Sequence, residues 1–450
     1  MLPYAGYVDP ESTLAIGVHH DGHLEDTERT FCSLYHTFIL HSTLSETAVT
    51  AHICTMLQLA FTTTISTPPA FSWQTVPLYW YSANPKGDFE ADTAAYAATF
   101  PIVVPNGNHK RFVAPAAMNE TGKLLDAALQ LKALNTSSTV LFYMNTMMDW
   151  SQYDVHRWIG SNHPEWWVQN DREEPVCLDA QPLFNLTIPA VRDHWLGVVT
   201  KALAAAPNAT YGGIFADRAN KLPKGNSVQP GPGQTTQNGI YTFDSDPDSC
   251  TCESDGSPPF KYSKDAYAAW ADGHSVLVQD AQKHVHNVDP TNAIVIANNN
   301  ASGVSGRQFE RWANKDFDGD TIASDIEELE AAGQASPPTV SLVHGGEPCD
   351  DAALALSLSA FLIGAGTRAY FACSDGWAVN DGWSKDQRPA EYDYPLGAPL
   401  GLAKRTVDGQ TTTYTRAFAS GTKVSLALSF GAISDGDACI QWSNGETTGC

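Results

Sequence analysis

The chain has 450 residues and a formal net charge of −24, from 50 acidic against 26 basic side chains. An acidic field of this size repels nucleic acid and anionic membrane surfaces, so we expect no nucleic-acid partner and no membrane insertion. The length suits one large α/β domain with appended segments, and a hydrophobic fraction of 43% is enough for a large core.

Residues 1–72 form a weakly patterned segment that ends near Pro68-Pro69, and we expect it to be separate from the rest. Residues 1–30 carry His, Asp and Glu rather than the basic start and apolar core of a standard signal peptide. Nine Cys residues and several glycosylation sequons nevertheless favour a secreted or lumenal glycoprotein with disulfide bonds. The sequons begin at Asn119, Asn135, Asn185, Asn208 and Asn300.

The cysteines suggest disulfides rather than a metal site. Cys439 and Cys450 bracket a predicted C-terminal hairpin. Cys177 and Cys349 are candidate partners for the close pair Cys250 and Cys252. Because no repeated Cys-x2-Cys pair has zinc spacing, we expect no metal.

From residue 73 short strand-like runs alternate with longer stretches of helical periodicity, which is typical of βα units. The predicted strands are Pro77–Ser82, Pro101–Pro105, Val140–Asn145, Gly212–Asp217, Ala293–Asn298, Thr321–Asp325, Val340–His344 and Arg368–Cys373. The predicted helices are Thr121–Leu134, Pro189–Ala206, Lys264–His286 and Asp350–Ile363. Eight strands favour a (β/α)8 TIM barrel over residues 73–387, because closure removes both sheet edges.

Past this region the pattern changes to alternating polar and apolar residues. The predicted antiparallel strands are Thr411–Phe418, Lys423–Phe430 and Cys439–Trp442, with turns at Ser420-Gly421, Asp435-Gly436 and Asn444-Gly445. They predict a small β-sandwich-like domain over residues 388–450. Residues 226–239 and 244–259 form a long insertion rich in Gly, Pro, Asp and Ser after the fourth barrel strand.

Asp217 is the first catalytic candidate. It ends the apolar run Tyr211-Gly-Gly-Ile-Phe-Ala-Asp217-Arg218. Catalytic groups of parallel α/β folds gather at the carboxyl ends of strands, and a buried carboxylate there is costly unless it is paired or used.

Asp325 and Glu327 are the candidate partners, because a glycosidase needs two carboxyl groups across the scissile bond. Asp325 would end the sixth strand, and Glu327, two residues later, would face the same way. Strands four and six are separated by one strand, so carboxylates at their ends could oppose each other. The alternative is that Asp325, Glu327 and Glu328 form the acidic first turn of a helix.

Aromatic and polar residues cluster after the predicted strand ends, where rings could stack on sugar faces and amides could bind hydroxyl groups. Taken singly, each Trp is more often a core residue. The substrate-binding candidates are Tyr81, Asn145, Asp149, Trp150, Trp166, Trp167, Arg218, Asn298, His344, Asp375 and Trp377.

A calcium loop is the main rival interpretation of the acidic segment. Asn314-Lys-Asp316-Phe-Asp318-Gly319-Asp320, with Asp325 at the twelfth position, approximates an EF-hand loop that includes the Gly at position six. The match is incomplete, because the first position is Asn, the last is Asp rather than Glu, and only one loop occurs.

From about Phe71 to Trp442 the chain resembles the hypothetical glycosidases, a family of uncharacterised glycosyl-hydrolase-like TIM-barrel proteins. The stretches that carry the resemblance are Phe71–Pro77 (FSWQTVP), Phe142–Asn145 (FYMN), His163–Trp167 (HPEWW), Phe184–Trp195 (FNLTIPAVRDHW), Gly213–Arg218 (GIFADR) and Pro395–Leu400 (PLGAPL).

The step from the helix with Arg192 and Trp195 to the strand ending in Asp217 is also similar to the α-glucosidase and α-galactosidase superfamily. That resemblance implies Asp217 as nucleophile and Asp325 as acid/base, with Glu327 as substitute. The chain departs from the hypothetical family in having Asp325 where a Glu is commoner.

We therefore expect a glycoside hydrolase that cleaves an oligo- or polysaccharide with two carboxyl groups and no cofactor. Two alternatives remain open at this point. A non-catalytic carbohydrate-binding barrel would bind glycans without hydrolysing them. A calcium-dependent polysaccharide lyase would need the metal, and the acidic net charge disfavours its polyanionic substrate.

Overall fold

The computed structural model divides the chain into two units, Met1–Ile65 and Ser66–Cys450. Within the second unit the structure describes residues 69–113, 120–151, 153–169, 173, 175–178, 181–206, 210–219, 241–243, 250–252, 264–290, 294–299, 303–314, 317–429 and 437–450. The segment 1–65, most of the insertion after the fourth strand, the turn at Asp435-Gly436 and the sequons at Asn119, Asn208 and Asn300 lie outside the described residues.

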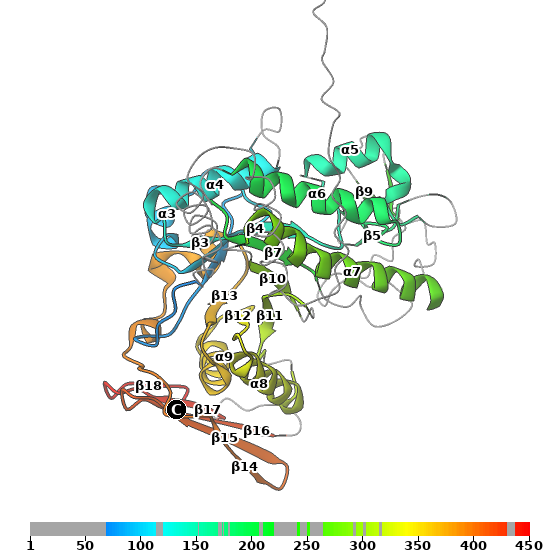
Figure 1. Ribbon diagram of the computed structural model, residues 1–450. Coiled ribbons are helices and arrows are strands. Elements are labelled where there is room, and N and C mark those ends of the chain that lie inside the picture. The colour runs from blue at the N-terminus through cyan, green and yellow to red at the C-terminus, as the bar shows by residue number, and fades with distance from the viewer. Residues whose placement is uncertain are drawn as a thin grey trace, which may run out of the picture. The chain divides into compact units, whose positions relative to one another are not determined.

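Six parallel strands form the main sheet, in the order β13-β12-β11-β10-β7-β4 (Figure 1). Their bounds are β4 (Phe142–Asn145), β7 (Gly213–Asp217), β10 (Ile294–Asn298), β11 (Gly306–Trp312), β12 (Val340–Gly346) and β13 (Ala369–Ser374). Five of them, β4, β7, β10, β12 and β13, are buried along their whole length, as expected for a parallel sheet covered on both faces.

A smaller parallel sheet contains β1 (Trp80–Ser82), β2 (Ile102–Pro105) and β3 (Thr139–Val140). β3 leads directly into β4, and the intervening Leu141 donates its backbone N–H to Val103. At the other edge Tyr79 donates to Phe371 of β13 over 3.3 Å, and Phe371 donates to Pro77 over 2.8 Å. Backbone hydrogen bonds thus join the small sheet to β4 on one side and to β13 on the other.

The helices between the strands follow the apolar periodicity of the sequence. Their bounds are α3 (Ala91–Ala97), α4 (Glu120–Leu134), α5 (Asp154–Asn162), α6 (Pro189–Ala205), α7 (Lys264–Val288), α8 (Gly319–Gln334) and α9 (Asp351–Gly364). α6 begins with Pro189, which has no N–H to leave unpaired in the first turn. The predicted helices at α4, α6, α7 and α9 are confirmed. Among the described residues no helix combines the length and apolarity needed to cross a membrane.

The predicted strand Thr321–Asp325 is wrong, because these residues lie inside α8. The Asp318 side chain accepts the N–H of Thr321 over 2.8 Å and caps the helix. Ile322, Ile326 and Leu329 recur at helical spacing and are buried. The strand at this place in the sheet is instead β11, which pairs with β10 and β12.

One glycine makes the central pairing possible. Gly213 begins β7 with φ +139°, and a Cβ built there would lie 1.9 Å from the backbone oxygen of Ile294 in β10. Only glycine permits this approach, so it allows β7 and β10 to pair from their first residues.

The C-terminal segment forms one five-stranded antiparallel sheet, in the order β14-β15-β16-β17-β18. The bounds are β14 (Lys404–Asp408), β15 (Thr411–Ala417), β16 (Lys423–Ser429), β17 (Ala438–Gln441) and β18 (Thr447–Thr448). The predicted antiparallel strands are confirmed. In the part of the chain that the structure describes, the sheet packs on α8 and α9 rather than on a second sheet (Figure 1).

Arg416 of β15 connects this sheet to α9. Its Nη1 donates to the carbonyls of Leu362, Ile363 and Ala365 over 2.7–3.0 Å, and its Nε donates to Gly401 over 3.0 Å. A guanidinium therefore satisfies the last carbonyls of a helix and lies at the negative end of its dipole.

Short elements complete the described part of the chain. They are β5 (Cys177–Leu178), β6 (Gln181–Pro182), β8 (Tyr241–Phe243), β9 (Cys250–Cys252), η1 (Pro164–Trp166), η3 (Val379–Trp383), η4 (Lys385–Gln387) and η5 (Ala390–Asp393).

Two disulfides lie among the described residues. Cys439–Cys450 closes the C-terminal hairpin at the two predicted positions. Cys349 bonds Cys373, so its expected pairing with Cys250 or Cys252 is wrong. The Cys349–Cys373 bond joins the segments that follow β12 and end β13.

Candidate active site

Three polar side chains lie level at the carboxyl ends of neighbouring strands. Asn145 at the end of β4 is paired in register with Asp217 at the end of β7. Ala216 of β7 is paired with Ala297 of β10, so Asn298 ends β10 level with Asp217. All three residues are buried. Asn145, Asp217 and Asn298 therefore form a row of polar side chains across the ends of three neighbouring strands.

Asp217 is the centre of this row. Its Oδ2 accepts hydrogen bonds from the Tyr143 hydroxyl over 2.5 Å and from Asn145 Nδ2 over 2.8 Å. Its Oδ1 accepts one bond, from Asn298 Nδ2, over 2.8 Å. A carboxylate that is 8% exposed thus has three donors, which fix its plane and satisfy both oxygens.

Glu310 of β11 is the second acid of the site, and the sequence analysis did not identify it. Asn298 Nδ2 donates to Glu310 Oε2 over 2.8 Å while it also donates to Asp217 Oδ1. Burial and the nearby charge of Asp217 raise the pKa of Glu310 from 4.5 to about 7, and the Asn298 bond opposes this rise. The negative charge of Asp217 therefore helps Glu310 to keep its proton up to about neutral pH.

The backbone is strained just where the strands end. Arg218, Asn299 and Glu347 follow β7, β10 and β12 directly, and each has a left-handed φ, of 50°, 59° and 69°. Arg311, beside Glu310, has φ 58°. Non-glycine residues in this region cost about 1–3 kcal/mol each and concentrate at functional sites. Their occurrence after adjacent strands points to this end of the sheet.

Aromatic rings surround the acids. The Tyr143 ring stacks on Phe215 with centroids 5.9 Å apart, and Tyr81 contacts Phe215 at 5.0 Å. Trp377, half-buried, contacts Tyr81 at 4.7 Å. Burial and the charge of Asp217 raise the pKa of the Tyr143 phenol well above its usual value, so the phenol stays a donor.

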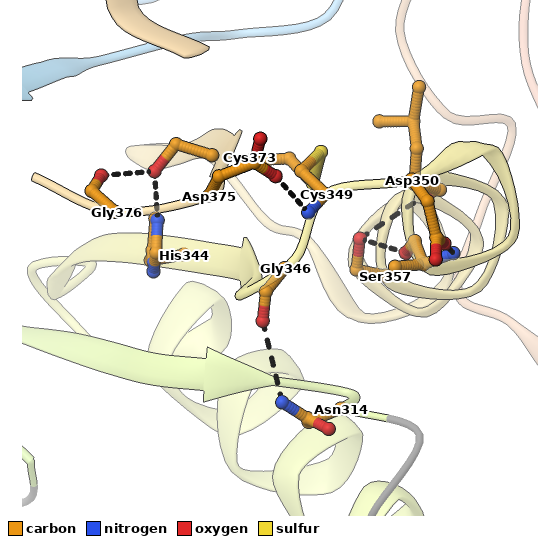
Figure 2. Close-up of a disulfide and its surroundings, with 12 residues drawn as sticks. Asn314, His344, Gly346, Cys349, Asp350, Ser357, Cys373, Asp375 and Gly376 are labelled. Carbon is orange, nitrogen blue, oxygen red and sulfur yellow. Dashed lines mark hydrogen bonds between the residues drawn. A yellow bond between two sulfur atoms is a disulfide. The ribbon is translucent and has the colours of Figure 1, made fainter. Parts of the chain in front are cut away.

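His344 of β12 is a neutral acceptor beside Trp377. The single Ser374 hydroxyl proton goes to the Gly376 carbonyl, so Ser374 Oγ must accept from His344 Nε2 (Figure 2). Burial lowers the pKa of His344 to about 3, which leaves Nδ1 with a lone pair. This Nδ1 is buried without a hydrogen-bond partner among the described residues, and the ring lies 4.4 Å from Trp377.

The loop beside His344 is held by Asp375 and the disulfide. Asp375 Oδ1 accepts the N–H of Cys349 over 2.7 Å, next to the Cys349–Cys373 bond (Figure 2). Asp375 is exposed, whereas Arg218 is half-buried and lies near enough to Glu310 to lower its pKa.

Asp325 and Glu327 lie elsewhere, on α8. Asp325 is half-buried, and its pKa is raised to about 6 by burial and by Glu328. Glu327 is 57% exposed and pairs with Arg405 of the C-terminal sheet over 3.1 Å. Neither residue ends a strand, so the reason for expecting them opposite Asp217 does not hold. The segment is helical, as the alternative expected, but Asp325, Glu327 and Glu328 lie in the middle of α8 and not in its first turn, which contains Asp320.

The tryptophans after β4 do not all lie in one place. Trp167 is buried and donates Nε1 to Asp149, which makes this pair a packing element. Trp166 stacks on His163 with centroids 4.3 Å apart, beside Trp158 of α5. Trp150 is half-buried and lies 5.9 Å from Tyr143, so of these tryptophans it is the one in contact with the Asp217 network.

The calcium interpretation does not fit the structure. α8 begins at Gly319, the sixth position of the supposed loop, and Asp318 is engaged as its N-cap. An EF-hand loop would still be coordinating the ion over these residues. Among the residues that the structure describes, no three His, Cys, Asp or Glu side chains are grouped to hold a metal.

Tyr143 and Glu310 are the functional candidates that the sequence analysis missed. Tyr143 lies inside the apolar run FYMN and looks like a core residue. β11 has the sequence GRQFERW, and its three charged residues are unusual for a central strand, so it was not predicted as one. Gln308 and Glu310 are two residues apart and so lie on one face of the strand, but Arg307 and Arg311 beside them hide any polar-apolar alternation.

The comparisons with solved structures give distant likenesses to glycosidases. A GH36 α-galactosidase, AgaA from Geobacillus stearothermophilus, is 10% identical with a TM-score of 0.42, over 80% of this chain and 48% of its own. A maltogenic α-amylase, AmyB from Thermotoga neapolitana, is 10% identical with a TM-score of 0.40, over 78% and 86%. This chain therefore spans about half the length of the α-galactosidase. No curated protein sequence matches the chain significantly.

The family comparison covers more than half of the chain. A model described as hypothetical glycosyl hydrolase family 15 matches residues 132–244 and 243–422. The matched ranges include β4, β7 and β10, which end in Asn145, Asp217 and Asn298, and β11, which carries Glu310. The chain belongs to hypothetical glycosyl hydrolase family 15.

Proposed function

We propose that the protein is a retaining glycoside hydrolase in which Asp217 is the nucleophile and Glu310 is the general acid/base. The substrate is an oligo- or polysaccharide, and no cofactor takes part. We further propose that the two parallel sheets close into a (β/α)8 barrel over residues 73–387. The hydrogen bonds from β3–β4 to β2 and from residues 77–79 to β13 support this closure.

One observation carries the proposal, namely that Asn298 Nδ2 lies 2.8 Å from an oxygen of each acid. The nearest oxygens of Asp217 and Glu310 therefore lie at most about 5.6 Å apart, twice that distance. Retaining glycosidases hold their carboxyl groups about 5–5.5 Å apart, whereas inverting enzymes leave about 6.5–9.5 Å for a water molecule. The spacing supports retention.

The different surroundings of the two acids support different roles. Glu310, with a pKa raised to about 7, can protonate the leaving oxygen as the glycosidic C–O bond breaks. Asp217 Oδ1 accepts a single bond and is the oxygen better able to attack the anomeric carbon. Water then cleaves the resulting ester, and its proton returns to Glu310.

The neighbouring side chains support a sugar as the substrate. Trp377, half-buried beside Tyr81, offers aromatic surface on which the C–H face of a sugar ring can stack. The two disulfides of the described residues support secretion or a lumenal location.

A mechanism-based cyclitol epoxide or aziridine panel, one reagent for each common sugar configuration, tests the proposal. We expect one reagent to add a single label, which peptide mass spectrometry places on Asp217. An Asp217→Asn variant should take up no label, whereas an Asp325→Asn variant should be labelled like the wild type.

Two results would contradict the proposal. Label on Asp325 or Glu327 would place the nucleophile on α8. Wild-type protein that binds glycans on an array, releases no product and takes up no reagent would be a carbohydrate-binding barrel instead.

A further inference from the structure

One amide group joins the two acids of the site. Asn298 Nδ2 carries two hydrogens, and each is directed to a different carboxyl group, Asp217 Oδ1 and Glu310 Oε2. Asn298 is 3% exposed, and its own oxygen is buried without a hydrogen-bond partner among the described residues. Both donors of this side chain are thus used within the protein, so none is left for a substrate hydroxyl.

We propose that Asn298 is a positioning residue that holds Asp217 and Glu310 at a fixed separation through the two N–H bonds of one nitrogen. The inference rests on the proposed function for its catalytic meaning, but the bridge itself can be tested without a substrate. It replaces the expectation that Asn298 binds the sugar.

The bridge would act differently at each stage of the reaction. When Glu310 gives up its proton, one N–H of Asn298 stabilises the new carboxylate. When Asp217 becomes an ester, the other N–H keeps its oxygen in place. Because both hydrogens belong to one rigid amide plane, a movement of either acid is felt by the other.

Asn145 provides a matched comparison. It has the same side chain and also donates over 2.8 Å to Asp217, but to Oδ2. Its own oxygen accepts the N–H groups of Met147 and Met148, so it holds the loop after β4. No bond joins Asn145 to Glu310 among the described residues. The two asparagines therefore differ in the one contact that the proposal concerns.

Several charged and titratable groups around Glu310 contribute to its pKa, which a titration would measure. Asp217 and Glu347 raise its pKa, and Arg218 lowers it, while burial is the largest cause of the rise. Tyr79 and Tyr81 of the first strand segment also face Glu310 and stay protonated, because burial raises the pKa of both phenols well above their usual value. Asn298 supplies a hydrogen bond to the ionised form of Glu310, which lowers its pKa.

The experiment follows the Glu310 carboxyl carbon by ¹³C NMR in protein labelled at glutamate Cδ, with the Glu310→Gln variant to assign the signal. We expect Asn298→Ala to move the titration midpoint of Glu310 upward by about one pH unit, since the variant removes a hydrogen bond that stabilises the ionised carboxylate. Asn145→Ala should leave the midpoint within about 0.3 unit of the wild type. Asn298→Val, which suits a strand, is the second variant if the alanine protein does not fold.

An unchanged midpoint in a folded Asn298 variant would overturn the inference, and so would an equal upward shift in Asn145→Ala. Failure of the cyclitol labelling would refute the proposed hydrolase but leave this titration result standing. A shifted midpoint together with label on Asp217 would support both.

Discussion

Two segments with candidate carboxylates, β11 and α8, lie close together in the sequence but in different parts of the structure. β11 carries Glu310, whose carboxyl group shares Asn298 with Asp217 at the strand ends. α8 carries Asp325 and Glu327, which lie on a helix and face other charges of the protein. The first segment has few acids and the second has many, so the number of carboxylates does not identify the site.

The difference lies in how each carboxylate is held. Glu310 accepts a hydrogen bond from a buried amide, which lowers its pKa. The charge of the nearby Asp217 raises that pKa. Glu327 pairs with an exposed arginine, where water screens the interaction. Glu310, near the carboxyl end of a central strand, is held by a buried amide, whereas Glu327 on α8 is held only by an exposed ion pair.

The largest expected effect separates Glu310 from Asp325 in catalysis. With a glycan identified by a panel of plant, algal and fungal substrates, Glu310→Gln should lower kcat by about 10²–10⁴-fold, because no group protonates the leaving oxygen. Asp325→Asn and Glu327→Gln should remain within about twofold of the wild type. Initial rates measure both. A greater loss in Asp325→Asn than in Glu310→Gln would reverse the comparison.

A smaller effect is expected when one donor to Asp217 is removed. Tyr143→Phe deletes the hydroxyl bonded to Oδ2 and should lower kcat by about 10–100-fold, equivalent to about 1.4–2.8 kcal/mol. Tyr414→Phe, whose hydroxyl is buried without a hydrogen-bond partner among the described residues, is the matched control and should retain full activity. Equal rates for the two variants would show that the Tyr143 bond does not serve catalysis.

The third prediction concerns stability. Glu310 and Asp325 should each destabilise the folded protein as pH rises, but over different pH ranges. The pKa of Glu310 rises from 4.5 to about 7 on folding, so the folded protein binds a proton that the unfolded chain releases. Stability is therefore lost as pH rises from about 4.5 through 7. Glu310→Gln should be more stable than wild type at pH 8 by about 1–2 kcal/mol, and equal to it at pH 4.

The pKa of Asp325 is raised from 3.8 to about 6, so its loss of stability should be complete about one pH unit lower than that of Glu310. Urea unfolding of Asp325→Asn and Glu310→Gln at intervals of half a pH unit measures both windows. Coincident windows would mean that the two carboxylates have the same environment.

The sequence predicted those parts of the site in which local pattern and tertiary role agree. Asp217 ends a run that is apolar because β7 is buried on both sides, so the acid stands out. α6 and α9 were predicted within one or two residues because Pro189 and Asp350 mark their starts. The parallel sheet arrangement followed from these elements.

The sequence failed where function overrides local pattern. β11 is a central strand, yet Arg307, Glu310 and Arg311 give it the composition of a loop. The segment 321–325 has strand-like residues, but Asp318 caps a helix there. The Cys349–Cys373 bond depends on the segment after β12 lying beside the end of β13, which no spacing in the chain reveals.

The guanidinium of Arg416 has a consequence for how the protein could be divided. It fills the place that water or a glycine turn would take at the end of α9, and Gly401 holds its other nitrogen. α9 is buried from Leu354 to Gly364, and β15, β16 and β17 of the C-terminal sheet pack against it. A fragment that stops before the C-terminal sheet would therefore expose apolar side chains of α9 and leave its last carbonyls without the guanidinium. Such a fragment should be less stable than the chain that keeps the sheet.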